Sequence, residues 1–345
     1  MKNLQPDLFT KPFSHIYIEE TILKHPRVQT ILKHFPDARQ ILIRHYKDVF
    51  CRPKQNLPMQ KSTPMLILAR KEQNLIYEGA PVCQNFGYKN FYYTSCIMNC
   101  IYCCDYCYLQ GMYPSGNLVI FINLEDIFQA IEEKLKHSDI YLCISYDTDL
   151  LALEGLTGYV KEWIAFAGKH PGLTIEIRTK SASFSTIELL KPIDNVTLAW
   201  TLSPQVIVEK YEHHTLSFSS RLSAAKSALK KGWPVRLCFD PMIYTSDWKY
   251  VYQDMVTQVF KEIDGRKIQD ASVGIFRVSK AYLKKMRKQN PDSSVLFYPY
   301  CVHNGVYEYE EVLAKQMVTF LIQELSKYIP SENIFSWEAQ NPKED

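Results

Sequence analysis

The segment "NCIYCCDYCYLQGMYP", residues 99–114, contains four cysteines within eight residues, and a fifth cysteine lies just upstream. Two overlapping C-x3-C-x2-C triplets fit this spacing. They are Cys96, Cys100 and Cys103, and Cys100, Cys104 and Cys107. Three thiolates suit a four-iron cluster in which one iron lacks a protein ligand and can bind a cofactor. A structural zinc site, which usually takes two separated ligand pairs, and a thiol redox pair are the alternatives.

Strand-like and helix-like runs alternate around this cluster. The strand-like runs are "KNFYYTS" at 89–95 and those at 118–123, 140–146, 173–180, 196–203, 234–240 and 271–278. Repeated β-α succession with right-handed crossovers builds a parallel sheet or barrel. About six β/α units are too few for a closed eight-unit barrel. We therefore expect an α/β fold, a partial (β/α)6 TIM-type barrel, with an open doubly wound sheet as the alternative.

The two ends of the chain depart from this pattern. Residues 1–85 contain helix-like runs at 25–35 and 38–50, which predict a small, α-rich N-terminal cap. Residues 86–345 are expected to form the partial barrel. Near its end, Asn304-Gly305 between β-favouring residues predicts a β-hairpin, and a helix over 310–328 closes the fold.

Composition indicates an ordinary globular protein. The chain has 345 residues, of which 46% are hydrophobic and 22% charged. No apolar run approaches the ~20 residues that span a bilayer, and residues 1–14 lack the apolar core of a signal peptide. These features predict a cytoplasmic location without a membrane partner. In a reducing cytosol, ten cysteines favour ligands, catalytic thiols or small core residues over disulfides.

The charge of the chain says less about function than the cysteine segment does. A net charge of +3 is too small to identify a nucleic-acid binder. The run "RVSKAYLKKMRK" at 277–288 nevertheless holds six lysines and arginines. Such a run suits either phosphate contacts or a solvated helix face.

The triplet Cys100, Cys104 and Cys107, with an aromatic residue before its last cysteine and a β/α succession after it, resembles the radical S-adenosylmethionine (SAM) superfamily. The Tyr-Leu-Gln that follows, residues 108–110, selects this register, because C-x3-C-x-Y-C-Y-L-Q resembles the spore photoproduct lyase family. The resemblance implies a 4Fe-4S cluster with SAM on its open iron. It also implies a DNA-repair lyase that reverts the thymine dimer 5-thyminyl-5,6-dihydrothymine to two thymines.

The resemblance also implies roles for residues at the strand ends, where such folds bind ligands. Lys180 matches a lysine that faces the SAM carboxylate. The full set expected to bind SAM is Ser145, Lys180, Thr201 and Ser203. Tyr106 and Tyr108 match two tyrosines that relay a radical, although core packing around the cluster is the other interpretation. Cys96 and Cys103 become spare thiols.

The hydrogen donor is where this sequence departs from the family, which uses a cysteine to return a hydrogen atom to the thymine methyl radical. Alignment on Leu-Thr-Gly at 156–158 puts Tyr146 at or near that position. We favour Cys83, in the loop "GAPVCQNFG", as the catalytic donor. The competing thiols are Cys103, Cys143 and Cys301.

A lesion inside duplex DNA has to be flipped out of the stack before it can react. The predicted hairpin, with Tyr307, has the aromatic and apolar content of a wedge, and Arg277 and Lys280 suit phosphate anchoring. The expected partners are double-stranded DNA containing thymine dimer lesions and an electron donor such as flavodoxin or ferredoxin. Two alternatives stay open: another radical SAM enzyme with a different substrate, and a non-catalytic, metal-stabilised nucleic-acid-binding protein.

Overall fold

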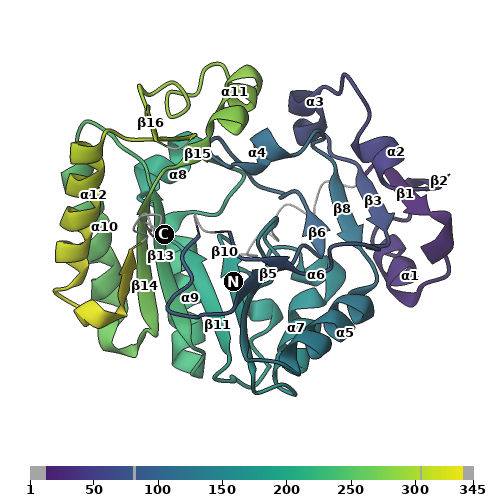
Figure 1. The fold of residues 1–345 in the computed structure, drawn as a ribbon, viewed down its shortest axis with the longest axis horizontal. Coiled ribbons are helices and arrows are strands. Elements are labelled where there is room, and N and C mark those ends of the chain that lie inside the picture. The colour runs from purple at the N-terminus through teal and green to yellow at the C-terminus, as the bar shows by residue number, and fades with distance from the viewer. Residues whose placement is uncertain (1–12, 81–82, 304, 337–345) are drawn as a thin grey trace, which may run out of the picture.

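The computed structural model describes residues 13–80, 83–303 and 305–336. Within these residues an eight-stranded sheet curls into a half-barrel (Figure 1). In spatial order its strands are β4 (Tyr77–Glu78), β5 (Phe91–Tyr93), β9 (Ile140–Cys143), β10 (Leu173–Thr179), β11 (Val196–Thr201), β13 (Val235–Met242), β14 (Asp270–Ile275) and β18 (Ile334–Ser336).

The strand order decides between the two predicted architectures. From β5 to β14, each strand pairs in parallel with the next sheet strand along the chain. β4 is antiparallel at one edge, and β18 adds a parallel strand at the other. A doubly wound sheet reverses its strand order at a switch point. The continuous order therefore confirms the partial barrel.

Helices cover the outside of this sheet (Figure 1). They include α5 (Leu124–Leu135), α6 (Glu154–Thr157), α7 (Tyr159–Ala167), α9 (Phe218–Lys231), α10 (Trp248–Glu262) and α12 (Glu311–Leu325), whereas α8 (Gln205–Tyr211) packs on β12 (Glu212–His213). α9 buries one face at helical spacing, is capped by the Ser217 hydroxyl and ends at Gly232, whose φ is +91°. Between β10 and β11 the chain forms only a 3-10 turn, η2 (Ser183–Thr186), and Pro192 disfavours helix at the residue before it.

A second, five-stranded sheet lies beside the half-barrel. Its order is β2 (Arg39–Ile43), β1 (His15–Glu19), β3 (Leu66–Ala69), β8 (Leu118–Phe121) and β6 (Ile97–Met98). The remaining helices here are short: α1 (Pro26–Leu32), α2 (Lys47–Phe50) and α3 (Leu57–Ser62).

This sheet corrects two expectations from the sequence. The helix expected over 38–50 is wrong in its first half, because residues 39–43 pair in parallel with β1, so the described part of the N-terminal region combines short helices with strands. The run at 118–123, expected in the barrel, instead pairs with β3. In both cases the outcome depends on pairing with distant residues, which the local pattern does not encode. The domain boundary at residue 85 stays a prediction.

The predicted C-terminal hairpin is confirmed. β16 (Cys301–His303) pairs antiparallel with β17 (Val306–Glu308), and Gly305 between them has φ +77°. Asn304 lies outside the described residues. β15 (Val278–Ser279) pairs with β17 and leads directly into α11 (Lys280–Gln289). α11 packs on α4 (Leu109–Met112), so the end of the cysteine segment lies beside the hairpin region (Figure 1).

A buried network around Arg236 joins four barrel strands, β9, β10, β13 and β14. The guanidinium of Arg236 on β13 donates to Glu176 on β10, to the hydroxyl of Tyr141 at 2.5 Å and to Asp270 on β14 at 2.8 Å. Burial would raise the pKa of Glu176, but Arg178 and Arg236 lower it to about 2. Glu176 therefore stays charged inside the sheet, and Arg236 forms ion pairs with both Glu176 and Asp270.

Arg236→Leu should lower the free energy of unfolding by about 3–5 kcal/mol, because it leaves the buried Asp270 without its cation and leaves Glu176 with Arg178 alone. Urea unfolding at neutral pH measures the loss. Arg266→Leu is the matched control, because Arg266 is 82% exposed and its ion pair with Asp264 is screened by water. Equal unfolding midpoints for Arg236→Leu and wild type would contradict this account.

Candidate functional site

The cysteine loop runs from β6 to α4 and is fastened to the barrel on its far side. β7 (Cys103–Cys104) pairs antiparallel with β12 (Glu212–His213), which follows α8. The N–H of Asp105 donates to the carbonyl oxygen of Tyr211 at 2.8 Å. Its carboxylate accepts a hydrogen bond from the Ser293 hydroxyl at 2.5 Å. These partners hold the loop over the carboxyl ends of the barrel strands, where such folds bind ligands.

The residues after the last cysteine attach the loop to α11. The side-chain amide of Gln110 donates to the carbonyl oxygen of Cys104 at 2.5 Å, and its amide oxygen accepts from Asn290 at 2.6 Å. A Cβ at Gly111 would lie 2.4 Å from the Cβ of Tyr282 on α11, so only glycine permits this approach. Gln110 and Gly111 thus help to hold the cysteine loop against α11.

The three thiols of the selected register are close enough to affect one another. Burial raises the pKa of Cys100, Cys104 and Cys107, and the charges of Cys107 and Cys104 also raise the pKa of Cys100. No group of three or more His, Cys, Asp or Glu side chains in the described residues is already drawn together as a metal site. The donor chemistry nevertheless fits a four-iron cluster, because three thiols from one loop leave the fourth iron open.

The other two cysteines of the segment have different surroundings. Cys96 is 1% exposed, and its sulfur lies 4.0 Å from the carbonyl oxygen of Ile144, inside the core. Cys103 is half-buried and lies opposite His213 in the β7–β12 pair. Core packing accounts for the position of Cys96. The β7–β12 pair holds Cys103 and Cys104 alike, so the choice of register stays a prediction.

Three of the predicted residues meet at Glu212, which the sequence analysis missed. The ammonium of Lys180 lies 3.3 Å from the Glu212 carboxylate and donates to the Tyr106 hydroxyl at 2.7 Å. Tyr106 and Ser203 both donate their hydroxyls to Glu212, and Arg221 forms an ion pair with it at 2.5 Å. Burial would raise the pKa of Glu212, but Lys180 and Arg221 lower it to about 2.

A second buried carboxylate, Asp147, lies beside the other predicted tyrosine. Ser95 and Tyr113 donate their hydroxyls to Asp147, and the Tyr108 hydroxyl lies 3.4 Å from it. Tyr108 also donates to the backbone carbonyl of Tyr146 at 2.9 Å. The sequence carried a signal for this residue, because "SYDTD" at 145–149 directly follows a strand and polar residues at that edge face the site.

Asp149 positions the end of β10. Its carboxylate accepts from the N–H of Lys180 and from the hydroxyl of Thr179, both at 2.7 Å. The ammonium of Lys180 then reaches the sulfur of Cys104 at 3.5 Å. A positive charge therefore lies between the cysteine loop and the strand ends, where an anionic group would be stabilised.

The structure brings the other residues expected to bind SAM to the same edge. The Ser145 hydroxyl accepts from the N–H of Arg178 at 2.7 Å. Thr201 is buried at the end of β11, and its carbonyl oxygen accepts from Arg221 at 3.3 Å. Ser145 and Thr201 thus flank Lys180 from the neighbouring strands β9 and β11.

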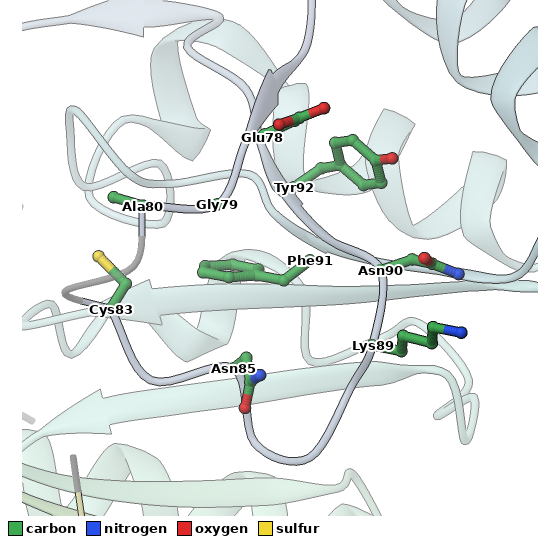
Figure 2. Close-up of a pocket in the computed structure, with 9 residues that line it drawn as sticks. All are labelled: Glu78, Gly79, Ala80, Cys83, Asn85, Lys89, Asn90, Phe91 and Tyr92. Carbon is green, nitrogen blue, oxygen red and sulfur yellow. The ribbon is translucent and has the colours of Figure 1, made fainter. Parts of the chain in front are cut away.

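Cys83 lies on the loop between β4 and β5, in the wall of a pocket that Phe91 also lines (Figure 2). Its sulfur shares a 3.1 Å hydrogen bond with the hydroxyl of Tyr146. The competing thiols are engaged elsewhere: Cys143 donates to Glu176 at 3.6 Å, and Cys301 lies in β16. Cys83 is therefore the thiol that contacts the residue at the family's donor position.

The residues predicted to contact DNA lie around the hairpin. Arg277 is half-buried, and both Cys83 and Asp240 lie within electrostatic range of it. Lys280 is exposed at the start of α11, and its N–H donates to the carbonyl oxygen of Gly305. Tyr307 lies in β17, under the guanidinium of Arg287 at 5.8 Å. The other exposed lysines of α11 are Lys284, Lys285 and Lys288.

Comparison with known proteins identifies the family. A model of the spore photoproduct lyase family matches residues 86–334, which is more than half of the chain. The chain belongs to the spore photoproduct lyase family. A curated spore photoproduct lyase from Geobacillus sp. is 21% identical over 251 residues, covering 68% of this chain and 73% of that protein.

Solved structures share the fold. A spore photoproduct lyase complexed with dinucleoside spore photoproduct has a TM-score of 0.81 and 17% identity, covering 94% of this chain and 99% of that one. A variant lyase with bound AdoMet and dinucleoside spore photoproduct has a TM-score of 0.80 at the same identity and coverage. The likeness thus extends to the N-terminal sheet, beyond the residues that the family model matches.

As a member of the spore photoproduct lyase family, the chain is a radical SAM lyase whose cofactors are a 4Fe-4S cluster and SAM. When bound, these cofactors supply a 5′-deoxyadenosyl radical. Within residues 13–80, 83–303 and 305–336, no helix is long and apolar enough to cross a membrane.

Single changes of Cys100, Cys104 or Cys107 to Ala should abolish iron binding, because each would remove one of three cluster ligands. Cys96→Ala and Cys103→Ala are the matched controls from the same segment and should retain iron. Iron content and the visible absorbance of anaerobically reconstituted protein measure the outcome. Loss of iron in either control would mean that the other register holds the cluster.

Proposed function

We propose that this chain repairs DNA by reverting spore photoproduct to two thymines. The observation that carries the proposal is a convergence at one end of the half-barrel. There, the cysteine loop, the ammonium of Lys180, the tyrosine pair and the thiol of Cys83 lie around the strand ends. Membership of the family indicates the substrate, and the relative solved with dinucleoside spore photoproduct shares the fold.

The cluster and SAM would be held by residues on either side of Lys180. We assign Cys100, Cys104 and Cys107 as ligands of the cluster. Lys180 would balance the carboxylate of SAM, and to do so it would exchange part of its contact with Glu212. The hydroxyl-bearing residues Ser145, Thr201 and Ser203 would complete the SAM site.

Hydrogen return would fall to Cys83. Burial raises the pKa of its thiol, so at neutral pH the sulfur keeps its hydrogen. A neutral S–H is the form that a carbon radical can take a hydrogen atom from. Tyr106 and Tyr108 flank Cys107 and would relay the radical away from the thiol. Of the two, Tyr108 is the one that borders Tyr146, at 6.0 Å between ring centres.

Duplex DNA would bind along the rim formed by α11 and the hairpin. Lys280, at the start of α11, is exposed and would contact phosphates, whereas Arg277 is half-buried nearer Cys83 and would face the lesion. Tyr307 and the 48% exposed Val302 lie opposite each other in the hairpin and would brace the gap left by the flipped bases.

Two partners outside this site complete the proposal. An electron donor such as flavodoxin or ferredoxin would reduce the cluster. A cytoplasmic location is supported by the ten cysteines, all of them free, because an oxidising compartment would favour disulfides.

Anaerobic, reconstituted protein given dithionite, SAM and dinucleoside spore photoproduct should consume the lesion and release thymine, as chromatography would measure. The alternatives give different results. Cleavage of SAM with an intact lesion would indicate a radical SAM enzyme with another substrate. Protein that binds zinc and never develops the absorbance of an iron cluster would indicate a metal-stabilised binding module.

Lys280→Ala should weaken binding to lesion-containing duplex DNA and reduce the slope of log K against log salt by about 1, because one phosphate contact is lost. Lys230→Ala is the control, since Lys230 is exposed on α9, on the outside of the barrel. Fluorescence anisotropy across a salt series measures both. An unchanged slope in Lys280→Ala would remove this residue from the DNA interface.

A further inference from the structure

We propose that Tyr146 is a catalytic residue that restores the hydrogen atom lost by Cys83, so that a hydrogen-bonded thiol-phenol pair carries the first step of the radical relay. This inference rests on the proposed repair function. It adds a third tyrosine to the two that flank the last cysteine of the cluster loop.

Among the described residues, Tyr146 is the one side chain that shares a hydrogen bond with Cys83. It connects Cys83 to the side of the barrel where the cysteine loop lies. The Cys83 sulfur and the Tyr146 hydroxyl lie 3.1 Å apart. The Tyr146 ring stacks on Tyr93 at 4.2 Å between centroids, which fixes its orientation. On its other side, Tyr108 donates to the Tyr146 carbonyl at 2.9 Å, with 6.0 Å between the two rings.

The surroundings keep both groups in their hydrogen-bearing forms. Burial raises the pKa of Cys83, although the hydrogen bond to Tyr146 and the nearby charge of Arg178 oppose the rise. Burial and the neighbouring thiol also raise the pKa of Tyr146. Asp240 and Arg277 face Cys83 with opposite charges. An S–H and an O–H are therefore available side by side at neutral pH.

The steps balance in hydrogen atoms. The S–H bond of Cys83 breaks as the product thymine radical gains a C–H bond, which leaves a thiyl radical. The thiyl radical takes a hydrogen atom from the Tyr146 hydroxyl, so the S–H bond forms again and a tyrosyl radical remains on Tyr146. Tyr108 then loses the electron and proton that Tyr146 regains, and the oxidation moves toward the cofactor.

Other tyrosines in this region lack the same contact. Tyr93 stacks on Tyr146 and on Tyr77 at 4.8 Å, but no hydrogen bond joins its hydroxyl to Cys83 among those of the described residues. The hydroxyl of Tyr141 donates to Glu176 at 2.6 Å, beneath the strand ends. The contact with sulfur thus distinguishes Tyr146 from its aromatic neighbours, and Tyr93 provides a matched control.

Tyr146→Phe tests the pair, because it removes the hydroxyl and keeps the ring. In deuterated buffer the thiol carries solvent deuterium, so wild type should place deuterium in the thymine methyl group, and Tyr146→Phe should do the same. The variant should, however, consume severalfold more SAM per lesion repaired, because Tyr146 no longer returns a hydrogen atom to the thiyl radical of Cys83. Tyr93→Phe should match wild type in both measurements.

The results separate the inference from the proposed function. If wild type leaves the lesion intact, the repair function fails. If wild type repairs the lesion and Tyr146→Phe shows an unchanged ratio of SAM consumed to lesion repaired, Tyr146 has no part in the relay. If Cys83→Ala still delivers solvent deuterium to the thymine methyl group, the donor is another thiol and the pair is excluded.

A second readout needs no cofactor. The Tyr146 hydroxyl lowers the pKa of Cys83, so Tyr146→Phe should slow alkylation of Cys83 by iodoacetamide at fixed pH, since the thiolate is the reactive form. Mass spectrometry identifies Cys83 among the ten cysteines, and Tyr93→Phe should react at the wild-type rate. Equal rates in Tyr146→Phe and wild type would show that the thiol and the phenol are not paired in solution.

Discussion

The buried carboxylate of Glu212 is the group on which the arrangement of the site depends. Two cations, Lys180 and Arg221, balance it, and without them a charge at this depth would be costly. The same residue pairs its backbone with Cys104 in the β7–β12 ladder. One residue therefore sets both the charge around the strand ends and the position of the cysteine loop, so the loop's placement and the lysine's protonation are coupled.

This coupling gives the two tyrosines beside Cys107 different surroundings. The hydroxyl of Tyr106 donates to Glu212 and accepts from Lys180, so it is part of the charge network. Tyr108 instead lies between Asp147 and the Tyr146 carbonyl, away from those cations. In the proposed relay, the path from Cys83 through Tyr146 therefore reaches Tyr108 before Tyr106, and Tyr106 is better placed to respond to the charge that would bind beside Lys180.

The sequence predicted the features that depend on local pattern and missed those that depend on distant contacts. The β/α succession, the hairpin around Gly305 and the cysteine segment were readable because spacing and turn chemistry determine them. The strand at 39–43 was misread as helix, because only its pairing with β1 makes it extended. Glu212 gave no signal because it lies among other charged residues, and its burial comes from Lys180 and Arg221. Asp147 was readable in principle, from its place directly after a strand, and was overlooked.

In the proposed function, the position of Cys83 follows from what hydrogen transfer requires. A donor thiol has to lie near the product radical, and nothing in the chemistry requires it to come from a particular strand. With tyrosine at position 146, a thiol from a facing loop can approach the same place, and the phenol that replaces the donor becomes the thiol's hydrogen-bond partner. The backbone after β9 keeps a separate role, because the carbonyl oxygen of Tyr146 accepts from the Tyr108 hydroxyl at 2.9 Å whatever side chain stands at that position. In the proposed function, Tyr108 is therefore held beside Tyr146 by the backbone, while the donor thiol comes from another segment.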